Sequence, residues 1–208
     1  MAITTQKNGL SVVSVATKMS VIIPILFGIF YYQESAAFLK ITGIVLALIA
    51  VYLASTTKST SISSKNLLFP LLILIGSGII DVSLKFIEEY YVNETDAGIF
   101  SSAIFASAGS IGIFIILYQL LKGRMQLQFK NIIAGIVLGV PNYFSIYFLV
   151  KALRTQGLES STIFTVNNVS IVVLSTILGI ALFKEKLILK NWVGIALAVI
   201  SIVLVTLA

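Results

Sequence analysis

The chain has 208 residues, of which 58% are hydrophobic and 11% are charged, and its mean hydropathy is +1.07. A soluble domain averages about 25% charged residues, so lipid rather than water is the expected solvent. The net charge of +6 comes from basic residues in short segments between apolar runs, which is typical of membrane topology rather than nucleic-acid binding. The chain contains no Cys and no His, which excludes disulfides, thiol nucleophiles, zinc clusters and histidine general bases. We therefore expect an all-α polytopic membrane protein that is not an enzyme and uses no cofactor, metal or nucleic acid.

Seven apolar runs are long enough for a transmembrane helix, which needs about 20 residues. They cover 10–32, 37–55, 66–87, 98–121, 131–151, 160–183 and 190–207. The first run is the weakest, because Lys18 interrupts it, and it shows no small-residue cleavage pattern of a signal peptide. The longest polar break contains the segment 58–65, which we expect to link two halves of the chain.

Two stretches of the chain form an internal repeat. Equivalent residues are separated by a constant offset, which is the distance in sequence from Gly28 to Gly179. Two glycines and a glutamate recur in them without a gap, first as Gly28, Glu34 and Gly43 and again as Gly179, Glu185 and Gly194. Four earlier helices of the second half precede Glu185, whereas one helix precedes Glu34. The sequence thus predicts two five-helix units, with seven of ten helices present. Residues 1–57 would form the last two helices of the first unit, and residues 66–208 the complete second unit. Because five is odd, the two units would be inverted relative to each other.

These motifs resemble the drug/metabolite transporter superfamily, EamA-like type, over essentially the whole chain as helices four to ten. In that family the fourth helix of each repeat tends to carry a proline and then a glycine, followed by a turn glutamate and a glycine in the fifth helix. Pro24 precedes the first set of motifs, whereas Ser175 takes the place of the second proline.

The resemblance implies alternating-access transport of a small metabolite or drug-like solute across a bacterial cytoplasmic membrane, by an N-terminally truncated chain. The alternative is a non-transporting scaffold or degenerate remnant of such a transporter. If the chain begins at Met1, a homodimer is one way to complete the first half.

Polar residues inside the apolar runs are the first candidates for solute binding, because burying them in lipid is costly. Lys18 in the first half and Asn167 and Asn168 in the second lie at similar depths of their runs. The alternative is that Lys18 extends to the membrane surface and the asparagines bond across helices. Asp81 and Lys85 are four residues apart, which favours an intrahelical ion pair over a solute or proton site at Asp81.

A second group of candidates lies around Pro141, in the middle of the run 131–151. A proline removes a backbone donor and frees a carbonyl, and transporters use such breaks as binding sites. Asn142, Tyr143 and Tyr147 could then bind a polar solute. A packing kink lined by ordinary aromatic residues is an equally good interpretation, and Pro24 predicts a similar break in the first run.

The remaining polar and small residues are expected to be structural. Glu34 and Glu185 lie at turns, where each would cap the amides of the helix that follows it. Glycines such as Gly135 and Gly139 permit close helix packing. The acidic loop with Glu88, Glu89, Glu94 and Asp96 is expected to be solvated.

The membrane orientation stays open, because the positive-inside rule and the resemblance give opposite answers. The rule places the side with nine Lys and Arg residues in the cytoplasm and the C-terminus outside. The family's usual arrangement has a cytoplasmic C-terminus.

Overall fold

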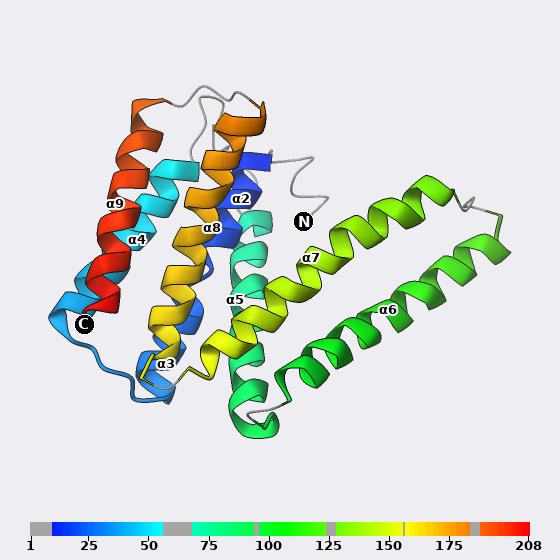
Figure 1. The fold of residues 1–208 in the computed structure, drawn as a ribbon, viewed down its shortest axis with the longest axis horizontal. Coiled ribbons are helices and arrows are strands. Elements are labelled where there is room, and N and C mark those ends of the chain that lie inside the picture. Colours follow the sequence, from blue (N-terminus) through cyan, green and yellow to red (C-terminus); the bar gives the residue numbers. More distant parts are fainter. Residues whose placement is uncertain (1–9, 56–67, 94–95, 124–127, 156, 184–187) are drawn as a thin grey trace. The chain divides into compact units, whose positions relative to one another are not determined.

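The computed structural model of the chain describes residues 10–55, 68–93, 96–123, 128–155, 157–183 and 188–208. Among these residues every regular element is an α-helix (Figure 1). The helices are α2 (Leu10–Met19), α3 (Ile22–Tyr31), α4 (Phe38–Ser55), α5 (Leu68–Tyr91), α6 (Ala97–Leu121), α7 (Phe129–Leu153), α8 (Ser160–Phe183) and α9 (Leu189–Thr206).

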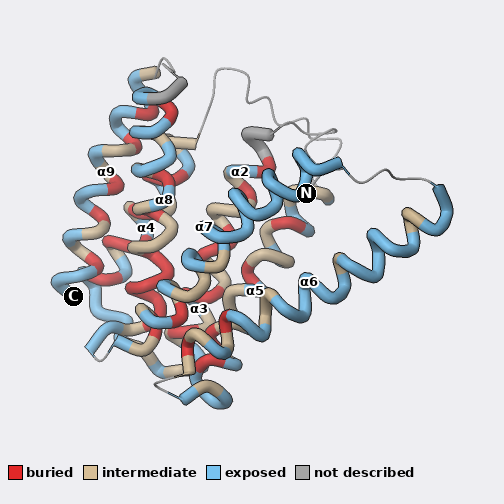
Figure 2. Tube along the Cα trace, turned by 45° about the vertical axis from the view of Figure 1, so that its right-hand side comes forward, coloured by how far each residue is buried: buried red, intermediate tan, exposed pale blue. Residues whose placement is uncertain are grey.

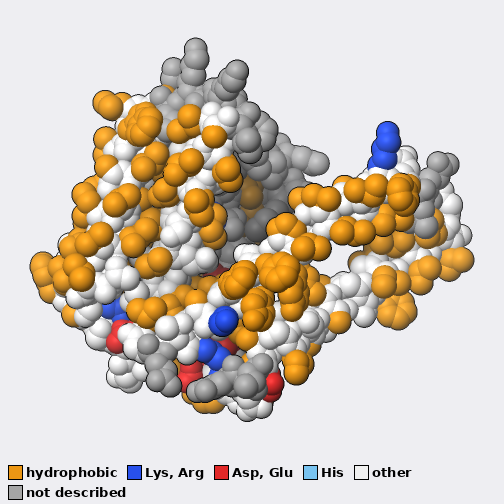
Figure 3. Space-filling view, in the orientation of Figure 1, with side chains coloured by type: hydrophobic (Ala, Val, Ile, Leu, Met, Phe, Trp, Pro, Cys, Tyr) orange, Lys and Arg blue, Asp and Glu red, His pale blue; other side chains and the backbone are white. Residues whose placement is uncertain are grey.

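Seven helical segments in the described part of the chain are long and apolar enough to cross a membrane. The first segment, Val13–Tyr31, combines α2 and α3, and the others are single helices. Large apolar side chains are exposed along these helices, and hydrophobic atoms cover much of the face seen in Figure 3. Such a surface is unfavourable in water but suits a lipid solvent. The protein is therefore a polytopic helical membrane protein, as the apolar runs predict.

The first membrane segment is interrupted between Met19 and Ile22. Pro24 explains the position of the break, because proline lacks an N–H and its ring clashes with the carbonyl four residues earlier, that of Ser20. The chain turns here through shorter-range bonds, in which the Ile23 amide donates to the Ser20 carbonyl at 3.0 Å. By contrast, α7 remains a continuous helix through Pro141.

The packing divides the chain into two compact units, Met1–Lys85 with Gly157–Ala208, and Phe86–Gln156. In the first unit, α4 and α9 lie antiparallel along each other (Figure 1). A Cβ at Gly43 would lie 2.6 Å from Val205 Cγ2, and one at Gly194 would lie 2.6 Å from the backbone nitrogen of Ala54. Only glycine permits backbones to approach so closely.

A small apolar core forms around this helix pair (Figure 2). Its buried members come from α4, α8 and α9 and are Ala47, Ala50, Val51, Val169, Val172 and Ala198. Met19, at the end of α2, packs against the same cluster. The core therefore joins helices from both expected halves of the chain. The expected linker 58–65 lies outside the described residues.

The second unit consists of the end of α5 together with α6 and α7. Tyr143 of α7 contacts α6, since its hydroxyl lies 3.3 Å from Ser102 Oγ and 3.4 Å from the Gly98 carbonyl oxygen. Its ring also meets Phe105 edge-on at 5.7 Å between centroids. Apart from such contacts, most side chains of α6 and α7 are exposed (Figure 2).

We predict that Gly194→Ala destabilises the protein, because the new methyl group would meet the backbone of α4. Overpacking of this kind costs about 1–3 kcal/mol, which thermal unfolding in detergent would register as a lower midpoint. Gly109→Ala is the matched control, since a Cβ there meets nothing within 4 Å. Equal midpoints for Gly194→Ala and Gly109→Ala would show that the α4–α9 contact is not tightly packed.

Candidate functional site

The residues that the sequence predicts for solute binding fall in both units. Lys18 lies in the last turn of α2, Asp81 in α5, and Asn167 and Asn168 in α8, all in the first unit. Asn142, Tyr143 and Tyr147 lie in α7, in the second unit. The two groups therefore belong to different compact units.

Lys18 and Asp81 interact electrostatically across two helices of the first unit. Lys18 stands at the carboxyl end of α2, where the helix dipole favours a cation. The two charges form no ion pair within 4 Å in the described part of the chain. Lys85, expected as the partner of Asp81, instead lies with its Nζ 5.6 Å from the centroid of the Tyr32 ring.

The asparagines and tyrosines make mostly local contacts. Asn168 donates through Nδ2 to the Phe164 carbonyl one turn earlier, at 3.1 Å. Asn167 is half-buried. The rings of Tyr143 and Tyr147 stack with centroids 6.3 Å apart, and the Tyr143 hydroxyl contacts α6. Asn142 is exposed.

A second polar cluster lies where α4 and α8 begin, and Glu34 is its centre. The Glu34 carboxylate accepts hydrogen bonds from the amides of Ser160 and Ser161 at 2.8 and 3.0 Å, and also from both serine hydroxyls. These serines are the first two residues of α8, whose free amides favour a negative charge. Glu34 thus caps α8 and not α4, the helix that follows it in sequence, so the predicted partner was wrong. Glu185, the second predicted capping residue, lies outside the described residues.

The turn before Glu34 is shaped to receive its carboxylate. A Cβ on Gly28 would lie 2.8 Å from Glu34 Oε2, so a glycine leaves room for the acid. Gln33 adopts a positive φ of 55°, and the amides of Tyr32 and Glu34 both donate to the Gly28 carbonyl. This geometry gives a physical reason for the pairing of a glycine with a glutamate six residues later.

Glu159 and Lys40 complete the cluster. Glu159 directly precedes α8 but accepts hydrogen bonds from the Ser35 amide and hydroxyl, in the segment before α4, at 3.0 and 3.2 Å. Glu34 lies before α4 and bonds to the start of α8, so each carboxylate binds the other helix's N-terminal segment. Lys40, almost fully buried on α4, pairs with Glu159 and has its Nζ 3.7 Å from Glu34 Oε2.

The ionisation of Glu159 follows from these contacts. Burial alone would raise the pKa of Glu159, but hydrogen bonds from Lys40 and Ser35 and the charge of Lys40 outweigh it, so the pKa is lowered. A lowered carboxyl pKa means that the stabilising contact is present at neutral pH and is lost only as the pH falls through that value.

Sequence reasoning missed Lys40 and Glu159. The one local signal was the run Glu159-Ser160-Ser161-Thr162 before an apolar stretch, which marks the start of a helix. Nothing in that signal identifies a partner in a distant part of the sequence.

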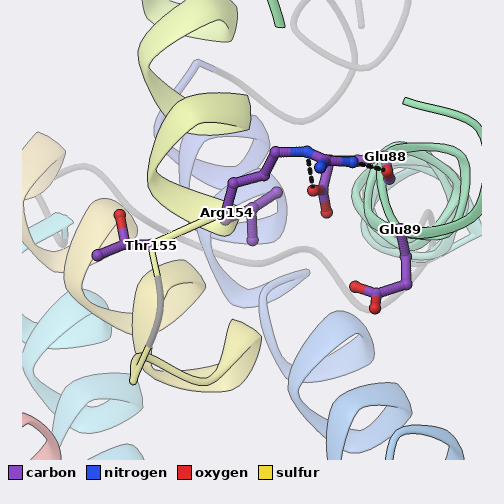
Figure 4. Close-up of a pocket in the computed structure, with 5 residues that line it drawn as sticks. Glu88, Glu89, Arg154 and Thr155 are labelled. Carbon is purple, nitrogen blue, oxygen red and sulfur yellow. Dashed lines mark hydrogen bonds and ion pairs between the residues drawn. The ribbon is translucent and has the colours of Figure 1, made fainter. Parts of the chain in front are cut away.

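The second unit holds an ion pair of its own (Figure 4). Arg154 Nε lies 2.8 Å from Glu88 Oε1, and its Nη2 donates to the carbonyls of Glu88 and Val92 at the end of α5. Glu88 is 2% exposed, so its assignment to a solvated loop was wrong. Helix α5 runs on to Tyr91, and Arg154 compensates the carboxyl end of that helix.

A cavity of about 200 Å³ lies beside the Arg154–Glu88 pair. Glu89, Leu153 and Thr155 also line it, and Figure 4 shows Glu89 directed away from the guanidinium. Of the other acidic residues expected in this loop, Glu94 lies outside the described residues, and Asp96 accepts a hydrogen bond from Asn93 at 3.0 Å. Among the described residues, no group of three or more His, Cys, Asp or Glu could hold a metal ion.

Comparison with known proteins finds a relative without an assigned function. No model of a known protein family matches the chain. An uncharacterized protein of Haemophilus influenzae is 30% identical over 190 residues, which are 90% of this chain and 63% of the relative. The chain therefore spans less than two thirds of the length of the protein that it matches.

We predict that Glu34→Gln destabilises the protein, because it removes the charge that faces the amides of α8. Loss of a charged helix cap costs about 1–2 kcal/mol, measured as a lower thermal midpoint in detergent. Gly28→Ala should act in the same direction by displacing the carboxylate. The exposed Glu89→Gln is the control, and a midpoint for Glu34→Gln equal to that control would contradict the capping role.

Proposed function

We propose that the chain is part of an inverted-repeat transporter of the EamA-like drug/metabolite type, which moves a small solute across the membrane by alternating access. The proposal is supported by two observations together, the internal repeat of the sequence and the packing of α4 against α9. It also places the protein in a bacterial cytoplasmic membrane, where that family is expected.

The reciprocal contact of α4 and α9 carries the proposal. Gly43, near the start of α4, faces Val205 near the end of α9, and Gly194, near the start of α9, faces Ala54 near the end of α4. The repeat offset carries Gly43 onto Gly194 and Ala54 onto Val205, so each contact maps onto the other. Such reciprocity is expected when two copies of one helix pack about a two-fold axis.

The helix bounds and buried faces agree with the same offset. Helix α4 covers Phe38–Ser55 and α9 covers Leu189–Thr206, so the two helices begin and end at equivalent positions of the repeat. Buried positions recur at this spacing, as the pairs Lys40 and Asn191, Gly43 and Gly194, Ala47 and Ala198, and Ala50 and Ser201. Since the two helices are antiparallel, the repeats to which they belong would have opposite orientations across the membrane.

The relative from Haemophilus influenzae leaves room for the helices that the repeat requires. The match covers 63% of its length, so more than a third of that protein lies outside the match. Each missing helix would need roughly 20 residues and a short loop, and three such helices fit within the unmatched part. A ten-helix protein is thus consistent with the size of the relative.

Within the first unit, the solute site would lie at the interruption between α2 and α3. Transporters often bind solutes at such breaks, where helix ends supply charge and unsatisfied backbone groups. Lys18 stands at this helix end, and Asp81 of α5 interacts with it electrostatically without a direct ion pair. Two opposite charges held apart inside a membrane can each bind a polar group of a solute. Asn167 and Asn168 of α8 would add neutral hydrogen-bonding groups.

Solute uptake by the full natural chain in liposomes tests this function. The vesicles would be offered a mixture of labelled amino acids, sugars and amines, and uptake would be compared with that of empty liposomes. We expect at least one solute to accumulate, and Lys18→Met or Asp81→Asn to reduce its uptake about tenfold or more, because a charged contact is lost. The exposed Lys151→Met is the control and should transport normally. If the full chain moves no solute above background, the proposal fails.

A further inference from the structure

Among the described residues, the contacts at the two ends of the α4–α9 pair differ. Asn191, the third residue of α9, donates through Nδ2 to the carbonyls of Leu53 and Ala54 at 3.1 and 2.9 Å, and its Oδ1 accepts from the Ile188 amide. The two donated bonds are neutral contacts with the backbone at the end of α4, and the accepted bond closes the start of α9. Lys40 is the third residue of α4 and lies at the opposite end of the antiparallel pair.

At the Lys40 end the contacts are ionic and involve a third helix. Lys40 pairs with Glu159, which directly precedes α8, and approaches Glu34, which caps α8. We call the set Glu34, Lys40 and Glu159 the latch. It joins the start of α4 to the start of α8 at one membrane surface. Removing its charges would leave neutral hydrogen bonds and the apolar core to hold these helix ends together.

The latch is placed where water can take over its contacts. The Glu159 side chain is 37% exposed. Beside it lies a cavity of about 110 Å³, whose lining includes Ser35, Lys40, Thr162 and Thr206. Because a water occupies about 30 Å³ of liquid, this volume is comparable to that of a few waters. Hydration of the partly exposed Glu159 carboxylate offsets part of the cost of separating it from Lys40, which is itself almost fully buried.

We propose that the latch is a releasable gate: it holds α4 and α8 together through the contacts described above, and it parts to let solute pass at this membrane surface. The Asn191 end stays closed during the same motion. This inference rests on the proposed transport function, because a gate has a purpose only if a solute passes.

Cysteine labelling in lipid nanodiscs tests the gate in the full natural chain without a solute. The sequence has no cysteine, so single reporters can be introduced. Thr162→Cys reports on the latch, since Thr162 is buried and lines the cavity. Ser201→Cys is the control reporter, since Ser201 is buried on α9 against α4. A membrane-impermeant maleimide measures how often each position meets water.

We expect Lys40→Gln and Glu159→Gln each to accelerate labelling of the Thr162→Cys reporter by roughly fivefold to tenfold, as loss of one partly exposed ion pair implies. The double variant should label no faster than either single variant, because both changes open the same latch. The Ser201→Cys reporter should stay protected in every variant, and Glu89→Gln should leave both reporters unchanged.

Two results would overturn the gate. One is an unchanged labelling rate of the Thr162→Cys reporter in both variants. The other is faster labelling of the Ser201→Cys reporter as well, which would mean that the latch only stabilises the fold. Because labelling needs no solute, failure of the gate and failure of solute uptake are observed separately.

Discussion

The close approach of α4 and α9 is the contact on which the rest of the first unit depends. Gly43 and Gly194 let the two backbones meet near both ends of the pair, and Ala47, Ala50 and Ala198 fill the space between them. In lipid, apolar side chains gain little by leaving the solvent, so helices associate through tight packing of small residues. Helix α8 then packs against this pair through Val169 and Val172. A larger residue at either glycine would destabilise this packing.

The same constraint decides where charge can be placed. Helices in a membrane satisfy their backbone groups internally, except at their ends. The capping charges outside the membrane segments lie at such ends, with Glu34 at the start of α8 and Arg154 at the end of α5. Lys18 also stands at a helix end, but this end lies within the first membrane segment, where Pro24 interrupts the helix. That placement distinguishes Lys18 from the capping charges and makes it the stronger candidate for solute binding.

The sequence predicted the seven membrane segments well, because an apolar run of sufficient length leaves few alternatives in lipid. It also identified Gly28, Glu34 and Gly43 through their recurrence, although not what they contact. Glu34 caps a helix that begins 126 residues later, and local patterns carry no information about such a partner. The error at Glu88 arose because α5 continues beyond its apolar run, held by an arginine that follows α7. The proposed solute site depends on interhelical geometry in the same way, as the electrostatic interaction of Asp81 with Lys18 illustrates.

The central claim is that α4 and α9 belong to repeats of opposite orientation, and the sidedness of their first residues tests it most directly. Ala37 and Ile188 each directly precede one of the two helices and are equivalent positions of the repeat. Single Ala37→Cys and Ile188→Cys variants would be labelled with a membrane-impermeant maleimide in sealed vesicles of uniform orientation. The account predicts that one position reacts only from outside and the other only when the reagent is admitted to the interior. Labelling of both positions from the same side would contradict the inverted repeat and the transport mechanism built on it.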